Sequence, residues 1–195
     1  MEQNNLTHEE SLRLIGGMIQ TAQNKFTDNS SHYLLWGYLV ALASFIHYVL
    51  IRLGLQELAW VPWPILMTAG GIIAGIMGYR SSKKAQVTTY TDRVAGFVWG
   101  GMVIVMFALL IQGASLGWQV VYPILMLLWG WALFISGGMI RFTPLILGGI
   151  YNWAMGIFAF YQPFDVQLLL IATSMVATYL IPGYMLKLKV KRDAA

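Results

Sequence analysis

The sequence predicts an all-α membrane protein, a helical bundle of six transmembrane helices preceded by a cytoplasmic amphipathic helix. The chain of 195 residues is 58% hydrophobic and only 10% charged, with a mean hydropathy of +0.65, whereas soluble domains carry about 25% charged residues. Its apolar residues come in long blocks, close to the roughly 20 residues that a helix needs to cross a bilayer. Its basic residues are concentrated in alternate connections, which is typical of multi-pass proteins.

Residues 1–31 are polar and are expected to form the cytoplasmic leader helix rather than a signal peptide, because they lack a basic start followed by an apolar core. Thr7 and Glu10 have the spacing of a capping box. Gly16 and Gly17 weaken the helix and mark either a break or a tight contact. Apolar residues recur at spacings of three and four, and this stripe is a candidate surface for the membrane, the bundle or a partner helix. We call it the leader stripe: Leu12, Ile15, Met18, Ile19 and Phe26.

The transmembrane domain is expected to cover residues 32–186, followed by a basic cytoplasmic tail at 187–195. Each expected span is a mainly apolar stretch, and the fifth is the shortest. The connections between the spans are short, except for the polar segment that follows the second span. The six spans are 32–53, 59–79, 94–113, 118–140, 144–161 and 165–186.

The orientation follows from the basic residues, because positively charged loops are retained in the cytoplasm. With the N-terminus inside, only Arg52 of the twelve Lys and Arg residues falls on the outer side. Five spans would place the basic tail outside, so six spans agree better with this rule. We therefore expect a multi-pass protein of a bacterial-type inner (plasma) membrane with both ends in the cytoplasm. The inner basic residues are Arg13, Lys25, Arg80, Lys83, Lys84, Arg93, Arg141, Lys187, Lys189, Lys191 and Arg192.

A pattern across the spans suggests three parallel repeats of one helical hairpin. Trp36, Trp99 and Trp153 take similar places near the start of the first, third and fifth spans. The second, fourth and sixth spans each end on a basic residue: Arg80, Arg141 and Lys187. Such repeats are related by an axis along the membrane normal, although hydrophobic segments also resemble one another by chance.

Glycines spaced four residues apart predict close helix packing, either within the chain or between subunits. They occur in the second span at Gly71 and Gly75 and in the third span at Gly96 and Gly100.

Two polar residues within the expected spans are candidates for an intramembrane site. Asn152 lies near the middle of the fifth span, where a primary amide needs a partner from another helix, a ligand or water. His47 lies one to two turns from the outer end of the first span and is either a packing histidine or a sensor of the outer environment. No Asp, Glu or Lys lies in the interior of a span, which argues against a proton relay made of carboxylates.

Enzymatic activity is not expected, because the sequence shows no positioned nucleophile, paired acids, phosphate loop or metal-ligand spacing. We expect no catalytic residue, cofactor or metal, and no nucleic-acid partner. The expected partners are the lipid bilayer, including anionic lipids at the cytoplasmic face, and a second copy of the chain or another protein. The leading interpretation is a non-enzymatic partner-binding or regulatory membrane protein. The alternative is a carrier or channel for a small neutral or apolar solute or lipid.

Overall fold

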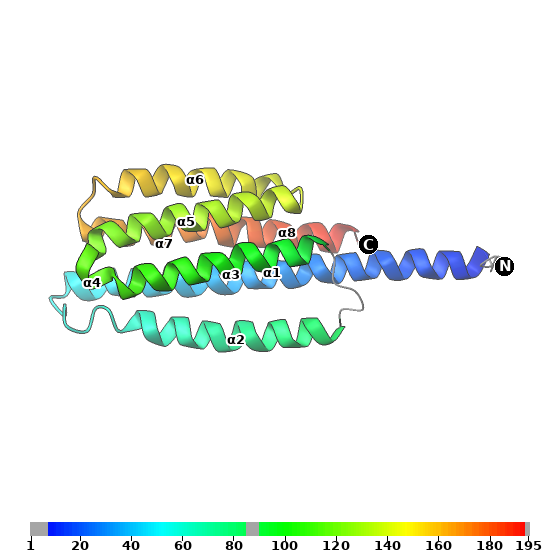
Figure 1. Cartoon of the computed structure of the whole chain (residues 1–195), viewed down its shortest axis with the longest axis horizontal. Helices are drawn as coiled ribbons and strands as arrows, with labels where there is room; N and C mark the ends of the chain where they lie inside the picture. The colour runs from blue at the N-terminus through cyan, green and yellow to red at the C-terminus, as the bar shows by residue number, and fades with distance from the viewer. Residues whose placement is uncertain (1–7, 85–89, 194–195) are drawn as a thin grey trace.

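The computed structural model of the chain is all-α, as expected (Figure 1). It describes the backbone of residues 8–84 and 90–193, and the side chains of residues 30–83, 93–188 and 192. The π-helical turn η1 continues directly from α7 into α8, so these three elements form one helical run, which we call the C-terminal helix. In order, the elements are α1 (His8–Arg52), α2 (Pro62–Lys84), α3 (Tyr90–Ile111), α4 (Gly113–Leu116), α5 (Trp118–Met139), α6 (Thr143–Ala159), α7 (Phe164–Met175), η1 (Val176–Leu180) and α8 (Ile181–Asp193).

The first helix joins the expected leader to the first expected span without a break. It runs for 45 residues, which corresponds to about 68 Å at 1.5 Å per residue. Gly16 and Gly17 do not interrupt it. The N-terminal half of α1 projects well past the ends of the other helices (Figure 1). The whole helix is about twice as long as the roughly 30 Å thickness of a bilayer core. The side chains of the leader stripe, Leu12, Ile15, Met18, Ile19 and Phe26, lie outside the described residues.

The long helices are neighbours in the order α2, α1, C-terminal helix, α6, α5 and α3. Adjacent helices run antiparallel: on α5 and α6, for example, Gly137 lies beside Ile146 and Leu127 lies beside Gly156. The start of α7 also approaches α5. Within the described residues, the backbones of α2 and α3 do not come close to each other, although they stand at the two ends of this order. The order curves back on itself, because the ring of Trp63 on α2 meets the ring of Tyr122 on α5. The arrangement is therefore a ring of helices with one opening, between α2 and α3.

Four helices in the described part of the chain are long and apolar enough to cross a membrane: Ser30–Arg52, Arg93–Ile111, Trp118–Met139 and Phe164–Leu188. They correspond to the first, third, fourth and sixth expected spans. The helix α6 has 17 residues, which gives it a length of about 26 Å. The helix α2 has two prolines at its start and contains four glycines, which make it less apolar than these four helices. Six spans are therefore not established by length and composition alone.

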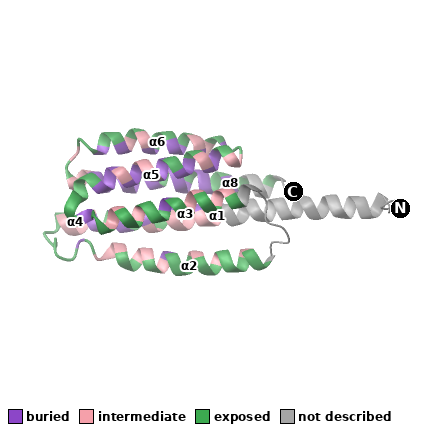
Figure 2. Cartoon of the chain, viewed as in Figure 1, coloured by how far each residue is buried: buried purple, intermediate pink, exposed green. Residues whose placement is uncertain are grey.

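The buried core lies between α1, α5, α6 and the C-terminal helix, whereas α2 and α3 are exposed over most of their surface (Figure 2). The core includes Met126 and Leu133 of α5, Leu145 of α6 and Ile171 of α7, each with no exposed surface. In contrast, Phe97 and Ile104 of α3 are 77% and 72% exposed. The peripheral helices thus carry large apolar side chains that only a nonpolar environment can cover.

Glycines allow α5 and α6 to pack closely. A Cβ atom added to Gly149 would lie 2.7 Å from the carbonyl oxygen of Gly130 and 2.8 Å from the backbone nitrogen of Phe134. Gly130 in turn faces the indole of Trp153. These distances leave no space for a side chain, so the two backbones are in direct contact, as in other membrane helix pairs with small residues. The glycines expected to pack, Gly71, Gly75, Gly96 and Gly100, instead have no described atom within 4 Å of the position that a Cβ would take.

Two helix ends use the same hydrogen-bonded turn with different residues. After α1, Gly54 has φ +79°, and the N–H of Leu55 bonds to the carbonyl of Leu50. After α5, Arg141 has φ +53°, and the N–H of Phe142 bonds to the carbonyl of Gly137. Both are Schellman motifs, in which glycine is the usual left-handed residue. An arginine there costs about 1–2 kcal/mol, so the second turn is strained and carries a positive charge.

The α5–α6 contact gives a direct stability prediction. Replacing Gly149 by alanine should destabilise the protein by about 1–3 kcal/mol, because the added methyl group forces two backbones apart. Gly71→Ala is the matched control: its Cβ meets nothing within 4 Å in the described part of the chain, so it should be neutral or stabilising by up to about 1 kcal/mol. Unfolding in mixed micelles measures both. Equal destabilisation of the two variants would contradict the close approach of α5 and α6.

Candidate functional site

Asn152 is the most deeply buried polar candidate. It projects from α6 toward the C-terminal helix and has no exposed surface. Its Nδ2 donates a hydrogen bond to Oγ1 of Thr178 at 3.2 Å, and the Thr178 hydroxyl donates to the carbonyl of Ser174 at 2.8 Å. Oδ1 of Asn152 and Oγ of Ser174 are buried and form no hydrogen bond with any described residue. We call these three residues the amide cluster.

The amide cluster lies at the π-helical turn of the C-terminal helix. Thr178 belongs to η1, where the normal α-helical hydrogen bonding is widened by one residue. A Cβ added to Gly148 would lie 3.2 Å from Cβ of Thr178, so a glycine on α6 allows the widened turn to approach. The cluster contains hydroxyl and amide groups and no acid or base, so its members are suited to hydrogen bonding with a neutral group.

His47 belongs to a different part of the bundle and packs among aromatic rings. Its Nδ1 accepts a hydrogen bond from Nε1 of Trp63 at 2.9 Å, and its ring meets the ring of Phe164 with centroids 5.6 Å apart. The stacked rings of Tyr122 and Phe164 continue this cluster toward α5. His47 therefore connects α1, α2 and α7 near the end of the bundle that carries Arg52, and no described contact joins it to Asn152.

The three tryptophans that suggested the repeat each pack on a neighbouring helix. Trp36 lies against Gly70 of α2. The indole N–H of Trp99 donates to Oγ of Ser136 on α5 at 3.1 Å. That of Trp153 donates to the carbonyl of Leu127, also on α5, at 3.1 Å. No ring contact joins any two of these tryptophans in the described part of the chain, so they do not form a shared aromatic cage there.

Gln167 is a buried polar residue that was not among the candidates predicted from the sequence. Its Nε2 donates to the carbonyl oxygens of Ala159, Gln119 and Gln162 at 2.9, 3.0 and 3.2 Å. These carbonyls belong to the end of α6, the first turn of α5 and the α6–α7 connection. The carbonyl of Gln119 has no i+4 donor, because Pro123 lacks an N–H. The carbonyls of Ala159 and Gln162 lie at the end of α6 and just beyond it, where helical partners run out. Gln167 supplies a donor to all three. A primary amide within the first turn of an apolar helix is the sequence signal that could have identified it.

Gln167→Leu should therefore destabilise the fold by about 1–3 kcal/mol, because the three carbonyls lose the amide donor and that of Gln119 has no helical N–H in its place. The control is Gln119→Leu, whose side chain makes only an exposed hydrogen bond of 3.4 Å and whose loss should cost less than about 0.5 kcal/mol. The two free energies of unfolding are measured under identical detergent conditions. A cost for Gln119→Leu equal to that for Gln167→Leu would rule out the proposed role.

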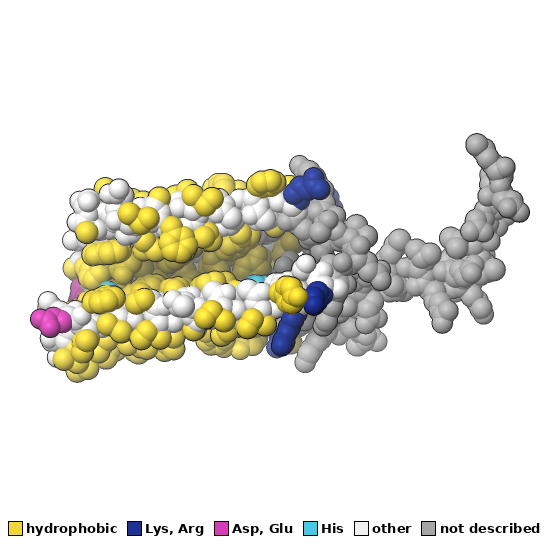
Figure 3. Space-filling view, turned by 60° about the horizontal axis from the view of Figure 1, so that its bottom comes forward, with side chains coloured by type: hydrophobic (Ala, Val, Ile, Leu, Met, Phe, Trp, Pro, Cys, Tyr) yellow, Lys and Arg dark blue, Asp and Glu magenta, His cyan; other side chains and the backbone are white. Residues whose placement is uncertain are grey.

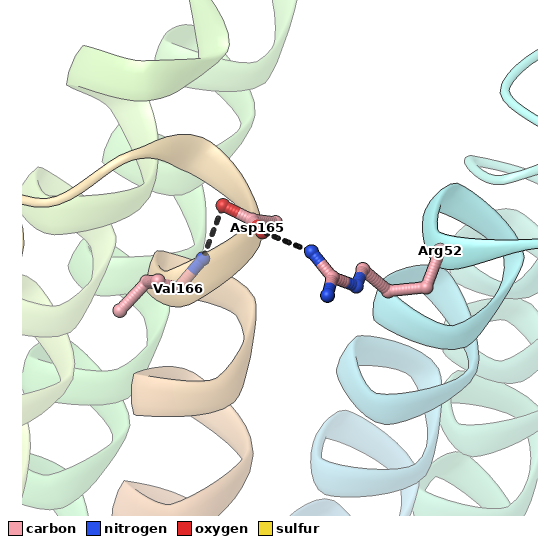
Figure 4. A network of polar contacts seen from close by, with 3 residues as sticks. All are labelled: Arg52, Asp165 and Val166. Atoms are coloured by element: carbon pink, nitrogen blue, oxygen red, sulfur yellow. Dashed lines mark hydrogen bonds and ion pairs between the residues drawn. The ribbon is translucent and has the colours of Figure 1, made fainter. Parts of the chain in front are cut away.

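The two ends of the bundle differ in charge. At one end, Nη1 of Arg52 pairs with Oδ2 of Asp165 at 3.5 Å, and Oδ1 of Asp165 accepts a bond from the N–H of Val166 at 3.0 Å (Figure 4). Glu57 is exposed at the same end. The opposite end carries the basic side chains (Figure 3), and those described are Arg80, Lys83, Arg93, Arg141, Lys187 and Arg192.

The described residues contain no cluster of three or more His, Asp or Glu that could hold a metal ion. Comparisons with family models, curated proteins and solved structures find no match to this chain. The candidate sites are thus neutral hydrogen-bonding groups in the core and a basic surface at one end.

Proposed function

We propose that the chain is a six-pass, non-enzymatic protein of a bacterial-type inner membrane, with both ends in the cytoplasm, and that it binds a partner through its N-terminal helix. The support for six passes is that α6 lies antiparallel along α5, with Gly137 beside Ile146 and Gly156 beside Leu127. In the same way α2 lies antiparallel along α1, where Trp63 bonds to His47 and Gly70 lies beside Leu39. A helix that accompanies a spanning neighbour for most of its length crosses with it.

The charge distribution supports the orientation. The end of the bundle with Arg80, Arg141 and Lys187 is strongly basic, whereas the other end carries Arg52 with two acidic residues. By the positive-inside rule, the basic end faces the cytoplasm. The projecting half of α1 is at the same end (Figure 1).

The order of the helices agrees with the suggested repeat. Taken around the ring, the hairpins are α2 and α1, the C-terminal helix and α6, and α5 and α3. In each pair the helix that runs toward the cytoplasm comes first. Three parallel hairpins related by an axis along the membrane normal would have this order.

Labelling of single cysteines tests the topology, and the chain offers a clean background because it contains no cysteine. With six passes, Ser115→Cys should react with a membrane-impermeant maleimide in intact cells, and Ser82→Cys should not. If only the four most apolar helices cross, these two results are reversed. Glu57→Cys is labelled and Ala194→Cys is protected in both cases, so these variants serve as controls.

The single observation that carries the partner proposal is the unbroken course of α1 from His8 to Arg52. A helix that is fixed in the bundle and extends roughly 30 Å beyond it presents the leader stripe to a cytoplasmic partner. An amphipathic helix of this kind binds by placing its apolar face in a groove or against another helix.

A photoactivatable amino acid tests this surface. At Ile15, in the leader stripe, it should crosslink to a discrete protein, either another copy or a different chain. At Asn24, which helical spacing places on the opposite face, it should not. Ile15→Glu should abolish crosslinking from a probe at Met18. Crosslinks only to lipid, or equal protein crosslinking from both faces, would overturn the proposal.

The carrier alternative receives less support from the geometry. Asn152 has no exposed surface and bonds to Thr178, which favours a role in helix packing. Bonds of this kind contribute about 0.6 kcal/mol on average in membranes.

A further inference from the structure

The opening in the ring of helices differs from the other contacts between hairpins. Where the C-terminal helix meets α1, a Cβ on Gly183 would lie 3.1 Å from Cγ of Leu34, and where α6 meets α5, a Cβ on Gly156 would lie 3.2 Å from Cγ of Leu127. Between α2 and α3 there is no corresponding approach in the described residues. Figure 3 shows a hollow at this place, lined mainly by hydrophobic side chains, with histidine side chains also visible along it.

The hollow is bridged at the Glu57 end and basic at the other. The ring of Trp63, at the start of α2, meets the ring of Tyr122 on α5 with centroids 5.7 Å apart, which connects α2 to the rest of the bundle there. At the other end, Lys and Arg side chains stand on both sides of the hollow (Figure 3). At this end, the last turns of α2 carry Arg80 and Lys83, and the first turn of α3 carries Arg93.

These three basic groups are available for an anion. All are exposed, and none forms an ion pair with a carboxylate of the described residues. Nζ of Lys83 lies 4.7 Å from the centre of the Tyr79 ring, a contact that holds the ammonium group near the end of α2 without neutralising it. Paired and neutralised charges are found at the other end, between Arg52 and Asp165.

The dimensions agree with one leaflet of a bilayer. From Trp63 to Arg80 the helix rises by about 25 Å, whereas the hydrocarbon chains of one leaflet occupy about 15 Å. Acyl chains that enter the hollow from the basic end therefore fit between that end and the contact of Trp63 with Tyr122.

We propose that the hollow between α2 and α3 binds a phospholipid with an anionic headgroup, whose phosphate lies between Arg80, Lys83 and Arg93 and whose acyl chains lie between the two helices. The charge complementarity selects this occupant, because a mainly apolar hollow with cations at one end matches an anionic headgroup followed by hydrocarbon chains. The bound lipid fills the one hairpin contact that the described part of the protein leaves open. This inference depends on the orientation in the proposed function, because it places the site in the cytoplasmic leaflet, where anionic lipids attract basic groups.

The test uses the full-length protein in vesicles that contain phosphatidylcholine and a trace of phosphatidylglycerol with a diazirine in its acyl chain. After irradiation, mass spectrometry locates the labelled peptides. Label should concentrate in residues 62–83 and 93–111, and it should exceed the label there from a phosphatidylcholine probe about tenfold or more, since each basic group adds about 1 kcal/mol.

Two charge variants complete the experiment. The triple variant Arg80→Gln, Lys83→Gln, Arg93→Gln should reduce labelling of α2 and α3 to the level of the phosphatidylcholine probe. The matched control Arg141→Gln, Lys187→Gln, Arg192→Gln removes the same number of charges at the same end and should leave the distribution of label unchanged. Labelling of Glu57→Cys from outside checks that both variants keep their orientation.

Label spread evenly over all lipid-facing helices, or equal loss in both triple variants, would overturn the lipid site. The test of the lipid site can be read separately from the test of the topology. Labelling of Ser82→Cys from outside would contradict the proposed six-pass topology. Cysteine labelling as predicted, together with even lipid labelling, would refute the lipid site alone.

Discussion

The close approach of helix backbones at glycines is the constraint on which the rest of the structure depends. In a bilayer, apolar side chains gain little by leaving lipid for a protein neighbour, so helices associate through close packing and hydrogen bonds. Gly149 and Gly130 bring α5 and α6 into contact, and Gly148 allows α6 to meet the π-helical turn at Thr178. Where glycines have no partner among the described residues, as between α2 and α3, the ring stays open.

Buried polar groups then fix how the packed helices align along their axes. Gln167 connects the ends of α5, α6 and α7 through three carbonyl groups, and Asn152 connects the middle of α6 to Thr178. Both amides are neutral, which avoids the large free energy of burying a charge in hydrocarbon. Charged groups remain at the helix ends, where, by our proposal, they set the orientation and bind lipid.

Much of the fold was predictable from the sequence, because long apolar blocks define helices by length alone. The boundaries of α5 differ from the expected span by one residue, and Asn152 lies in the core where an intramembrane amide was expected to need a partner. The continuity of α1 was not predictable, since polar residues and Gly16 favour a break. The packing role of Gly130 and Gly149 was not predicted, because a four-residue spacing identifies a small surface but not its partner. The glycines predicted to pack on α2 and α3 meet no described residue of this chain, and their contact between subunits stays a prediction. The amide of Gln167 was visible in the sequence as a polar residue in the first turn of an apolar helix, but its three partners were not predictable, because they are backbone carbonyls.

The central claim is that two of the three contacts between hairpins are closed and one is open, and disulfide formation in the cysteine-free chain tests it most directly. The pairs Leu34→Cys with Gly183→Cys and Leu127→Cys with Gly156→Cys join positions at which a glycine Cβ would lie 3.1 and 3.2 Å from the leucine Cγ. Both pairs should oxidise rapidly in membranes, whereas Gly75→Cys with Gly100→Cys, across α2 and α3, should remain reduced. Rapid oxidation of the third pair, or failure of the first two, would contradict this arrangement.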